Sequence, residues 1–332
     1  MTVPLSPLRA DIDLDAPGRH VGHVRLPYSS HESAYGWIPV PIAAIKGGAG
    51  PSVLLTAGNH GDEYEGQIAL LKLIRELDPS ALRGRIIVMP RLNLPAAAAG
   101  RRTSPIDGGN LNRVFPGDPE GTPTEQIACY VTSVLLPQTQ ASLDLHSGGS
   151  SLEYLPSAFA RVPSDDAARA AQRAALAAFG APLAIMIEKP QTARSLSAAA
   201  LAAGHLSFGT EIGGAGTTRP ATQAVADQGV RRFLAHLGMI EPPARPAAAP
   251  RFMRVIGAAH YVYAPVRGLF EPGFALGDMV RAGDPAGWIH FPEEPVRAPL
   301  ALRFEGDGMV VCRRVPSLVA PGDCLAHLAS DM

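Results

Sequence analysis

The first regular pattern along the chain is an alternation of apolar runs and amphipathic stretches that begins at residue 52. The run SVLLTAG, residues 52–58, is short and mostly apolar, which predicts a buried strand. The stretch QIALLKLIRELD, residues 67–78, spaces its apolar residues as a helix does. RIIVMP, residues 85–90, predicts the next strand. This order of strand, loop, helix and strand is typical of an α/β fold.

Helix start and stop signals continue this rhythm as far as residue 212. The segment Thr122 to Glu125 combines a capping box with proline at the first helical position, which predicts a helix that runs to about Leu136. The remaining predicted elements are helices at 164–180 and 197–203, with glycines that end them, and strands at 142–145, 182–187 and 205–212. We therefore expect a mixed, mainly parallel sheet between helices, with ligands at the carboxyl ends of its strands.

The region after residue 240 has a different character. Residues 240–250 are rich in proline and alanine without periodicity, which indicates a linker. Beyond it, the segments 268–283 and 308–322 look like two copies of one unit, and short strands with turn glycines predict a small β-barrel or sandwich at 251–332. This pattern is similar to biotinyl and lipoyl carrier domains, but no Met-Lys-Met or Asp-Lys-Ala hairpin is present. We expect a structural or oligomerising domain, compatible with a homo-oligomer, beside a larger domain at 1–240 whose first 45 residues form an extension.

The composition is that of an ordinary soluble globular protein. A charged fraction of 18% and a net charge of -1 exclude the polyelectrolyte surface that nucleic-acid binding requires. No apolar run approaches the roughly 20 residues that span a bilayer, and the N-terminus lacks the features of a signal peptide. We therefore expect a cytoplasmic protein with neither a nucleic-acid nor a membrane partner. The three cysteines lack CxxC spacing, so neither a disulfide framework nor a thiolate zinc cluster is indicated.

Two histidine-bearing loops follow predicted strands and suggest a metal site. GNHGDEYEG, residues 58–66, places His60 and Glu63 three residues apart in a glycine-rich turn. His146, in SLDLHSGG, again follows a strand and precedes glycines. A catalytic zinc ion typically binds three protein ligands and one water, and two histidines with one glutamate are an attested set. The sequence therefore predicts one zinc ion per chain, held by His60, Glu63 and His146.

The neighbouring acidic residues leave alternatives open. Taken alone, the HxxE spacing is a weak signal, and Asp62 and Glu65 are rival ligands in the first loop. We interpret Asp62 as a turn residue and Glu65 as the start of the helix, where a negative charge suits the dipole. Asp144 is either a partner that orients a histidine or a carboxylate that anchors its loop.

Further polar residues are candidates for catalysis and substrate binding. Glu211, in SFGTEIGG, is a third polar residue at a strand end. The loop SPIDGGNLNRVFPG, residues 104–117, carries Asn112 and Arg113, and an arginine can bind a carboxylate through two parallel hydrogen bonds. A structural salt bridge is the alternative for Arg113. Arg102, or Arg101 beside it, is a candidate to stabilise an oxyanion, although a surface position explains both nearly as well.

The motifs HGDE, NLNR, DLHSGG and GTEIGG occur in the order and rough spacing of the succinylglutamate desuccinylase/aspartoacylase family, relatives of zinc carboxypeptidases. The sequence resembles that family over roughly residues 45–240. The resemblance implies a sheet between helices with a C-terminal β domain, and a zinc-dependent amidohydrolase that deacylates N-acyl amino acids. It implies these roles for the matching positions: zinc ligands His60, Glu63 and His146, general base Glu211, α-carboxylate binders Asn112 and Arg113, and oxyanion-stabilising Arg102.

Within the family, the segments 58–73, 104–117 and 144–149 most resemble the Nα-acetyl-L-2,4-diaminobutyrate deacetylases of ectoine degradation. That substrate has a cationic side chain, and Glu153 is a candidate carboxylate to face it, with a solvated loop glutamate as the alternative. Two other functions remain open. One is a metallocarboxypeptidase acting on peptides, and the other is a non-catalytic zinc-binding or ligand-binding protein, against which the presence of Glu211 argues.

Overall fold

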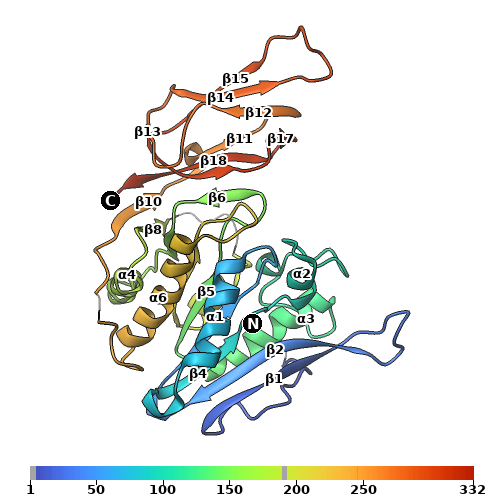
Figure 1. Cartoon of the computed structure of the whole chain (residues 1–332), viewed down its shortest axis with the longest axis vertical. Coiled ribbons are helices and arrows are strands. Elements are labelled where there is room, and N and C mark those ends of the chain that lie inside the picture. Colours follow the sequence, from blue (N-terminus) through green and yellow to red (C-terminus); the bar gives the residue numbers. More distant parts are fainter. Residues whose placement is uncertain (1–4, 189–192, 245) are drawn as a thin grey trace.

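A long twisted sheet forms the centre of the molecule, and a computed structural model describes its residues 5–188, 193–244 and 246–332 (Figure 1). The strand order in the larger part is β1-β2-β4-β3-β5-β9-β7-β8. These strands are β1 (Gly18–Pro27), β2 (Trp37–Lys46), β3 (Gly48–Ala57), β4 (Arg83–Met89), β5 (Ala141–Leu145), β7 (Ser157–Arg161), β8 (Leu183–Ile187) and β9 (Leu206–Glu211). The helices are α1 (Tyr64–Glu76), α2 (Leu94–Ala99), α3 (Pro123–Tyr130), α4 (Asp166–Phe179), α5 (Leu196–Ala202) and α6 (Pro220–His236). Among the described residues, none of these helices combines the length and apolar character that a membrane span requires.

The middle of the sheet is parallel, as the alternation of strands and helices predicts. β3 pairs in parallel with both β4 and β5, and β5 pairs in parallel with β9. The N-terminal residues differ from the prediction, because β1 and β2 form an antiparallel hairpin that adds to the sheet through β4. In β1, exposed and buried residues alternate from Val21 to Pro27, as in an edge strand with one covered face, whereas β2 is apolar from Trp37 to Ile45.

Each face of the sheet carries its own hydrophobic core. Val53 and Leu55 of β3 pack with apolar residues of α1, α4 and α6 on one face. Leu54 points to the other face and packs with residues of α3 and α5. Successive residues of a strand point to opposite faces, so a strand covered on both sides is apolar throughout. This explains the apolar run at 52–58 and confirms the predicted mixed, mainly parallel fold.

The predicted helix ends are close to the observed ones. Thr122 Oγ accepts a hydrogen bond from the Glu125 backbone N–H at 3.4 Å, and the Glu125 carboxylate accepts one from the Thr122 N–H at 2.9 Å, so the capping box is present. α3 then continues through a π-helical turn (Val131–Leu135) and a 3₁₀ turn (Leu136–Gln138). Gly180 ends α4 with φ of 74°, a left-handed conformation that favours glycine.

The C-terminal strands form two facing sheets that remain joined to the large sheet. They are β10 (Arg251–Val255), β11 (Tyr261–Tyr263), β12 (Gly268–Pro272), β13 (Met279–Val280), β14 (Pro285–His290), β15 (Leu300–Arg303), β16 (Gly308–Arg314), β17 (Leu318–Val319) and β18 (Cys324–Asp331). β10 pairs in parallel with β8 and antiparallel with β18, so the ladder of backbone hydrogen bonds continues into this region. The short strand β6 (Leu152–Tyr154) pairs with β16 and makes a second connection. Within the segment predicted as a linker, residues 241–244 and 246–250 form neither helix nor strand.

The two similar segments of this region end in the same turn. Gly283 and Gly322 have φ of 92° and 88°, and each is followed by an aspartate. The carboxylates of Asp284 and Asp323 accept hydrogen bonds from the backbone N–H three residues earlier, at 2.8 and 2.9 Å. An aspartate that bonds its own backbone and a glycine with positive φ stabilise tight turns. The internal similarity in the sequence thus has a local structural counterpart.

Candidate metal centre and active site

His60, Glu63 and His146 converge on one buried point. His60 Nδ1 lies 2.7 Å from one oxygen of Glu63, and His146 Nδ1 lies 2.7 Å from the other. One ligand atom from each residue can be chosen so that all three lie within 4.8 Å of one another. The structure therefore brings together the three residues that the sequence nominated as metal ligands.

The sheet explains why residues so distant in sequence meet here. β3 and β5 are parallel neighbours with Ala57 opposite Leu145, so the loops that follow them leave the sheet at the same edge. Gly61 has no room for a side chain, because a Cβ atom there would lie 2.1 Å from the backbone of Ala96. This close approach fixes the path of the first loop and directs His60 toward Glu63.

Each histidine is oriented by a polar partner on its other ring nitrogen. His146 Nε2 lies 2.8 Å from Asp144, whose carboxylate also accepts hydrogen bonds from Thr56 and Asn59. His60 Nε2 lies 3.2 Å from the side-chain oxygen of Asn110. Such partners fix the tautomer and turn Nδ1 toward the shared point, as is common for metal-binding histidines. Asp144 was predicted as a possible orienting partner from the sequence, whereas Asn110 was not predicted, although it belongs to the NLNR motif.

The charges of the cluster favour a cation. Burial raises the pKa of Glu63, but the two histidines outweigh this and leave that pKa below its ordinary value. Burial lowers the pKa of His60 despite the adjacent carboxylate. For His146 burial also acts to lower the pKa, but Asp144 and Glu63 raise it well above the ordinary value. An ionised carboxylate between two imidazoles is a donor set attested for catalytic zinc.

The rival acidic residues of the first loop have structural partners. Asp62 accepts hydrogen bonds from the backbone N–H and the hydroxyl of Ser150, at 2.8 and 2.7 Å, and so ties the two histidine loops together. Glu65 lies in the first turn of α1, where Thr222 donates a hydrogen bond to it. Both positions agree with the interpretation of Asp62 as a turn residue and Glu65 as a helix start.

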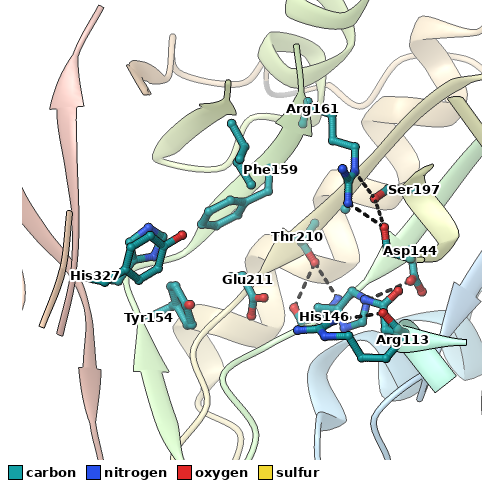
Figure 2. A pocket seen from close by; sticks show the side chains of 16 residues that line it. Arg113, Asp144, His146, Tyr154, Phe159, Arg161, Ser197, Thr210, Glu211 and His327 are labelled. Atoms are coloured by element: carbon teal, nitrogen blue, oxygen red, sulfur yellow. Dashed lines mark hydrogen bonds and ion pairs between the residues drawn. The ribbon is translucent and has the colours of Figure 1, made fainter. Parts of the chain in front are cut away.

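Glu211 ends β9 and lines the same cavity as His146 (Figure 2). β9 is the parallel neighbour of β5, so its carboxyl end reaches the same edge of the sheet. One carboxylate oxygen is shielded from solvent and has no hydrogen-bond partner among the described residues. Burial and the charge of Glu63 raise the pKa of Glu211 well above its ordinary value. A carboxyl group with a raised pKa can both accept and donate a proton near neutral pH.

Arg102, predicted to stabilise the oxyanion, and Asn112 and Arg113, predicted to bind the substrate, lie beside the cluster or in the cavity. Arg102 Nη1 is 3.3 Å from His60 Nδ1 and 3.5 Å from Glu63, whereas Arg101 is exposed. Asn112 Nδ2 is 3.4 Å from His146 Nε2. Arg113 lines the cavity. Burial lowers the pKa of Arg113, and the positive charge of Arg102 adds a smaller effect in the same direction.

The cavity has a volume of about 240 Å³ and two chemically different ends. One end carries the guanidinium groups of Arg113 and Arg161, and Arg161 is held by the hydroxyls of Ser195 and Ser197 at 2.9 and 3.3 Å. The other end is lined by the aromatic rings of Tyr154, Phe159, Tyr261 and His327. The sequence analysis missed Arg161 and this aromatic end, because neither belongs to a short motif.

Glu153 is a predicted site residue that neither lines this cavity nor pairs with the metal cluster. Its carboxylate, with the residue 4% exposed, accepts hydrogen bonds from Arg313 at 2.6 and 2.9 Å and also pairs with Arg219. Glu153 is not among the described residues that line the cavity. Its carboxylate is therefore engaged by two arginines between β6, β16 and the start of α6, and is not free to face a cationic substrate group.

The sequence of the catalytic region decides the family. A family model described as the succinylglutamate desuccinylase/aspartoacylase catalytic domain matches residues 49–237, more than half of the chain. The chain belongs to the succinylglutamate desuccinylase/aspartoacylase family. The matched residues contain the histidine and glutamate cluster, Glu211 and the loop with Asn112 and Arg113.

Similar proteins in this family cover almost the whole chain. The N-alpha-acetyl-L-2,4-diaminobutyric acid deacetylase of Halomonas elongata is 43% identical over 328 residues, which are 98% of this chain and 95% of that protein. The succinylglutamate desuccinylase/aspartoacylase structure from Rhodobacter sphaeroides is 41% identical with a TM-score of 0.93, over 98% of this chain and 99% of that one. The product-bound ectoine utilization protein EutE (DoeB) from Ruegeria pomeroyi is 37% identical with a TM-score of 0.95, at the same coverage. The family likeness thus extends through the C-terminal strands.

Proposed function

We propose that this chain is a cytoplasmic, zinc-dependent deacylase that hydrolyses the amide of Nα-acetyl-L-2,4-diaminobutyrate in ectoine degradation. The observation that carries the reaction class is the convergence of His60, Glu63 and His146 on one point, with Glu211 lining the same cavity as His146. The substrate is inferred from the 43% identity, over 98% of the chain, to the Halomonas elongata deacetylase.

The proposed metal is one zinc ion per chain, and the donor set fits it. The two Nδ1 atoms and the Glu63 carboxylate offer three ligands from residues that are 2–8% exposed, which leaves a fourth position for water or substrate. When bound, a zinc ion supplies Lewis acidity, which lowers the pKa of water to about 7 and polarises an amide carbonyl. Asp144 and Asn110 would keep the two imidazoles oriented while the ion is exchanged or bound.

Glu211 has the proposed role of general base and acid. Its carboxylate would take the proton from the attacking water and then donate it to the departing amine, so that one residue serves both halves of the hydrolysis. The raised pKa fits the second half, because a strongly acidic carboxyl group would not hold the proton long enough to pass it on.

Arginine and asparagine side chains have the proposed role of holding the substrate. Arg113 and Asn112 would bind the α-carboxylate, since both lie at the cavity and the guanidinium matches a carboxylate geometrically. Arg102, whose guanidinium reaches the metal cluster, would stabilise the oxyanion that forms at the amide carbon.

A panel of N-acyl amino acids and short peptides tests the proposal directly. With zinc-loaded protein, we expect the highest kcat/KM for Nα-acetyl-L-2,4-diaminobutyrate, measured by release of acetate. Faster cleavage of acetyl-aspartate or succinyl-glutamate would contradict the substrate while leaving a zinc deacylase. Cleavage of peptides alone would instead identify a metallocarboxypeptidase.

Arg113→Ala is expected to lower kcat/KM for that substrate about tenfold to a hundredfold, because a hydrogen bond to a charged group contributes roughly 1.5 to 3 kcal/mol. The loss should disappear when the substrate's α-carboxylate is capped as an amide. Arg101→Ala is the matched control, since this nearby arginine is exposed. An unchanged preference for the free carboxylate in Arg113→Ala would remove Arg113 from the proposed role.

A further inference from the structure

Four neighbouring strands bring a row of side chains to the aromatic end of the cavity. Tyr154 of β6 is paired with Cys312 of β16, Cys312 is paired with His327 of β18, and His327 is paired with Tyr261 of β11. Directly paired residues of neighbouring strands project from the same face of a sheet. The adjacent residues Val262 and Leu328 point the other way, into the core between the two C-terminal sheets. The row therefore faces the catalytic cavity.

The rings in this row are packed in a defined arrangement. Tyr261 stacks on His327 with ring centroids 4.4 Å apart and an angle of 8° between the planes. Tyr154 meets the same imidazole edge-on at 6.2 Å, and Phe159 lies on it at 6.4 Å. Figure 2 shows Tyr154, Phe159 and His327 together at one end of the cavity. The end is thus walled by aromatic rings from both the catalytic region and the C-terminal strands.

His327 carries polar atoms without a partner in this wall. The residue is 4% exposed, and neither ring nitrogen has a hydrogen-bond partner among the described residues. Burial lowers the pKa of His327 to about 3, so the imidazole is neutral at neutral pH. A neutral imidazole offers one N–H donor and one lone pair. Buried polar groups are normally satisfied, so an unpartnered imidazole at a cavity wall indicates that a ligand supplies the partner.

The charges of the cavity are separated along its length. The two arginines that line it, Arg113 and Arg161, lie on the side away from His327 (Figure 2). The lining residues described at the aromatic end include no lysine or arginine, and the charge of Glu211 acts on Tyr154 there. A ligand with a carboxylate at one end and a cation at the other matches this separation.

We propose that Tyr154, Tyr261 and His327 form the pocket that selects the ammonium group of the substrate's side chain. The ammonium would lie against the faces of the tyrosines and donate a hydrogen bond to the imidazole lone pair. This inference rests on the proposed function, because it concerns the side chain of the substrate named there. It assigns substrate choice to Tyr154, Tyr261 and His327 and not to Glu153, whose carboxylate is already paired.

A matched pair of substrates measures this selectivity. Nα-acetyl-L-norvaline replaces the ammonium of Nα-acetyl-L-2,4-diaminobutyrate with a methyl group of similar size. For zinc-loaded Tyr261→Leu, we expect the ratio of the two kcat/KM values to fall about threefold to thirtyfold, the range of a cation–π contact. Tyr261→Phe, which keeps the aromatic face, should retain the ratio. His327→Phe should lower it about tenfold or more, because the hydrogen-bond acceptor is lost.

The outcomes separate this inference from the proposed function. If the wild type prefers the cationic substrate and both Tyr261→Leu and His327→Phe keep that preference, the pocket assignment is overturned and the function stands. Equal losses for both substrates would also overturn it, since they indicate a structural role. A loss of selectivity in Glu153→Gln but in neither of the other variants would return the role to Glu153. If the wild type shows no preference for the cationic substrate, the proposed substrate itself fails.

A crystal structure of the zinc-loaded wild type with L-2,4-diaminobutyrate gives an answer that does not depend on the folding of any variant. We expect the side-chain ammonium within about 6 Å of the ring centroid of Tyr261 or Tyr154, the distance range of a cation–π contact. An ammonium bound at the arginine end, or directed to solvent, would overturn the proposal.

Discussion

Glu211→Gln is expected to lower the turnover of Nα-acetyl-L-2,4-diaminobutyrate by at least about a hundredfold while the zinc content stays unchanged. Glutamine has nearly the same shape as glutamate but cannot take a proton from water. Because Glu211 lies at the cavity wall and is not one of the three clustered ligand candidates, its replacement should leave the metal centre intact. Turnover, zinc content by elemental analysis and binding of the product would be measured on the same sample.

Glu188→Gln is the control for this experiment, since Glu188 is an exposed glutamate just after β8. It should keep normal turnover. Near-normal turnover in Glu211→Gln would exclude this residue as the general base. Loss of zinc in Glu211→Gln would mean that Glu211 helps to hold the metal, and its assignment as general base alone would be wrong.

His60→Ala and His146→Ala are expected to lose the metal and the activity together. A site with three protein ligands holds about one zinc ion, and removal of one imidazole leaves only two ligands, too few for tight binding. Loss of either histidine would also leave the buried Glu63 carboxylate with one partner fewer. The free energy of unfolding should therefore fall in both variants. Zinc per chain and deacetylase activity after incubation with zinc are the measurements.

His205→Ala provides a buried histidine outside the cluster for comparison. His205 is hydrogen-bonded to the backbone oxygen of Leu136. The His205→Ala variant should therefore retain zinc at the cluster, even if the protein becomes less stable. Full zinc occupancy in both His60→Ala and His146→Ala would refute the ligand assignment. The comparison separates loss of a ligand from general damage to the fold.

Much of the catalytic region could be predicted because its signals are local. The apolar run at 52–58, the capping box at Thr122 and the glycine at 180 each reflect interactions within a few residues. The metal cluster was also accessible, since the carboxyl ends of adjacent parallel strands meet at one edge of the sheet. His60 and His146 could therefore be paired from two separate motifs.

Features that depend on tertiary contacts were not accessible from the sequence. The strands β1 and β2 were treated as part of an extension, although buried and exposed residues alternate in β1 and β2 is apolar from Trp37 to Ile45. Tyr261 and His327 are far from every motif, and their meeting depends on strand register. Glu153 was assigned by its closeness to His146 in sequence, but it lies on β6 and faces Arg313 of β16. Closeness along the chain does not fix the direction of a side chain.

The placement of β18 also affects how the protein is made on the ribosome. Chains are synthesised from the N-terminus, and early domains generally fold first. The clustered residues and Glu211 all precede residue 212, whereas His327 lies on the strand that follows every other described strand. A nascent chain therefore has the residues of its hydrolytic centre before Tyr261 and His327 can complete the aromatic end of the cavity.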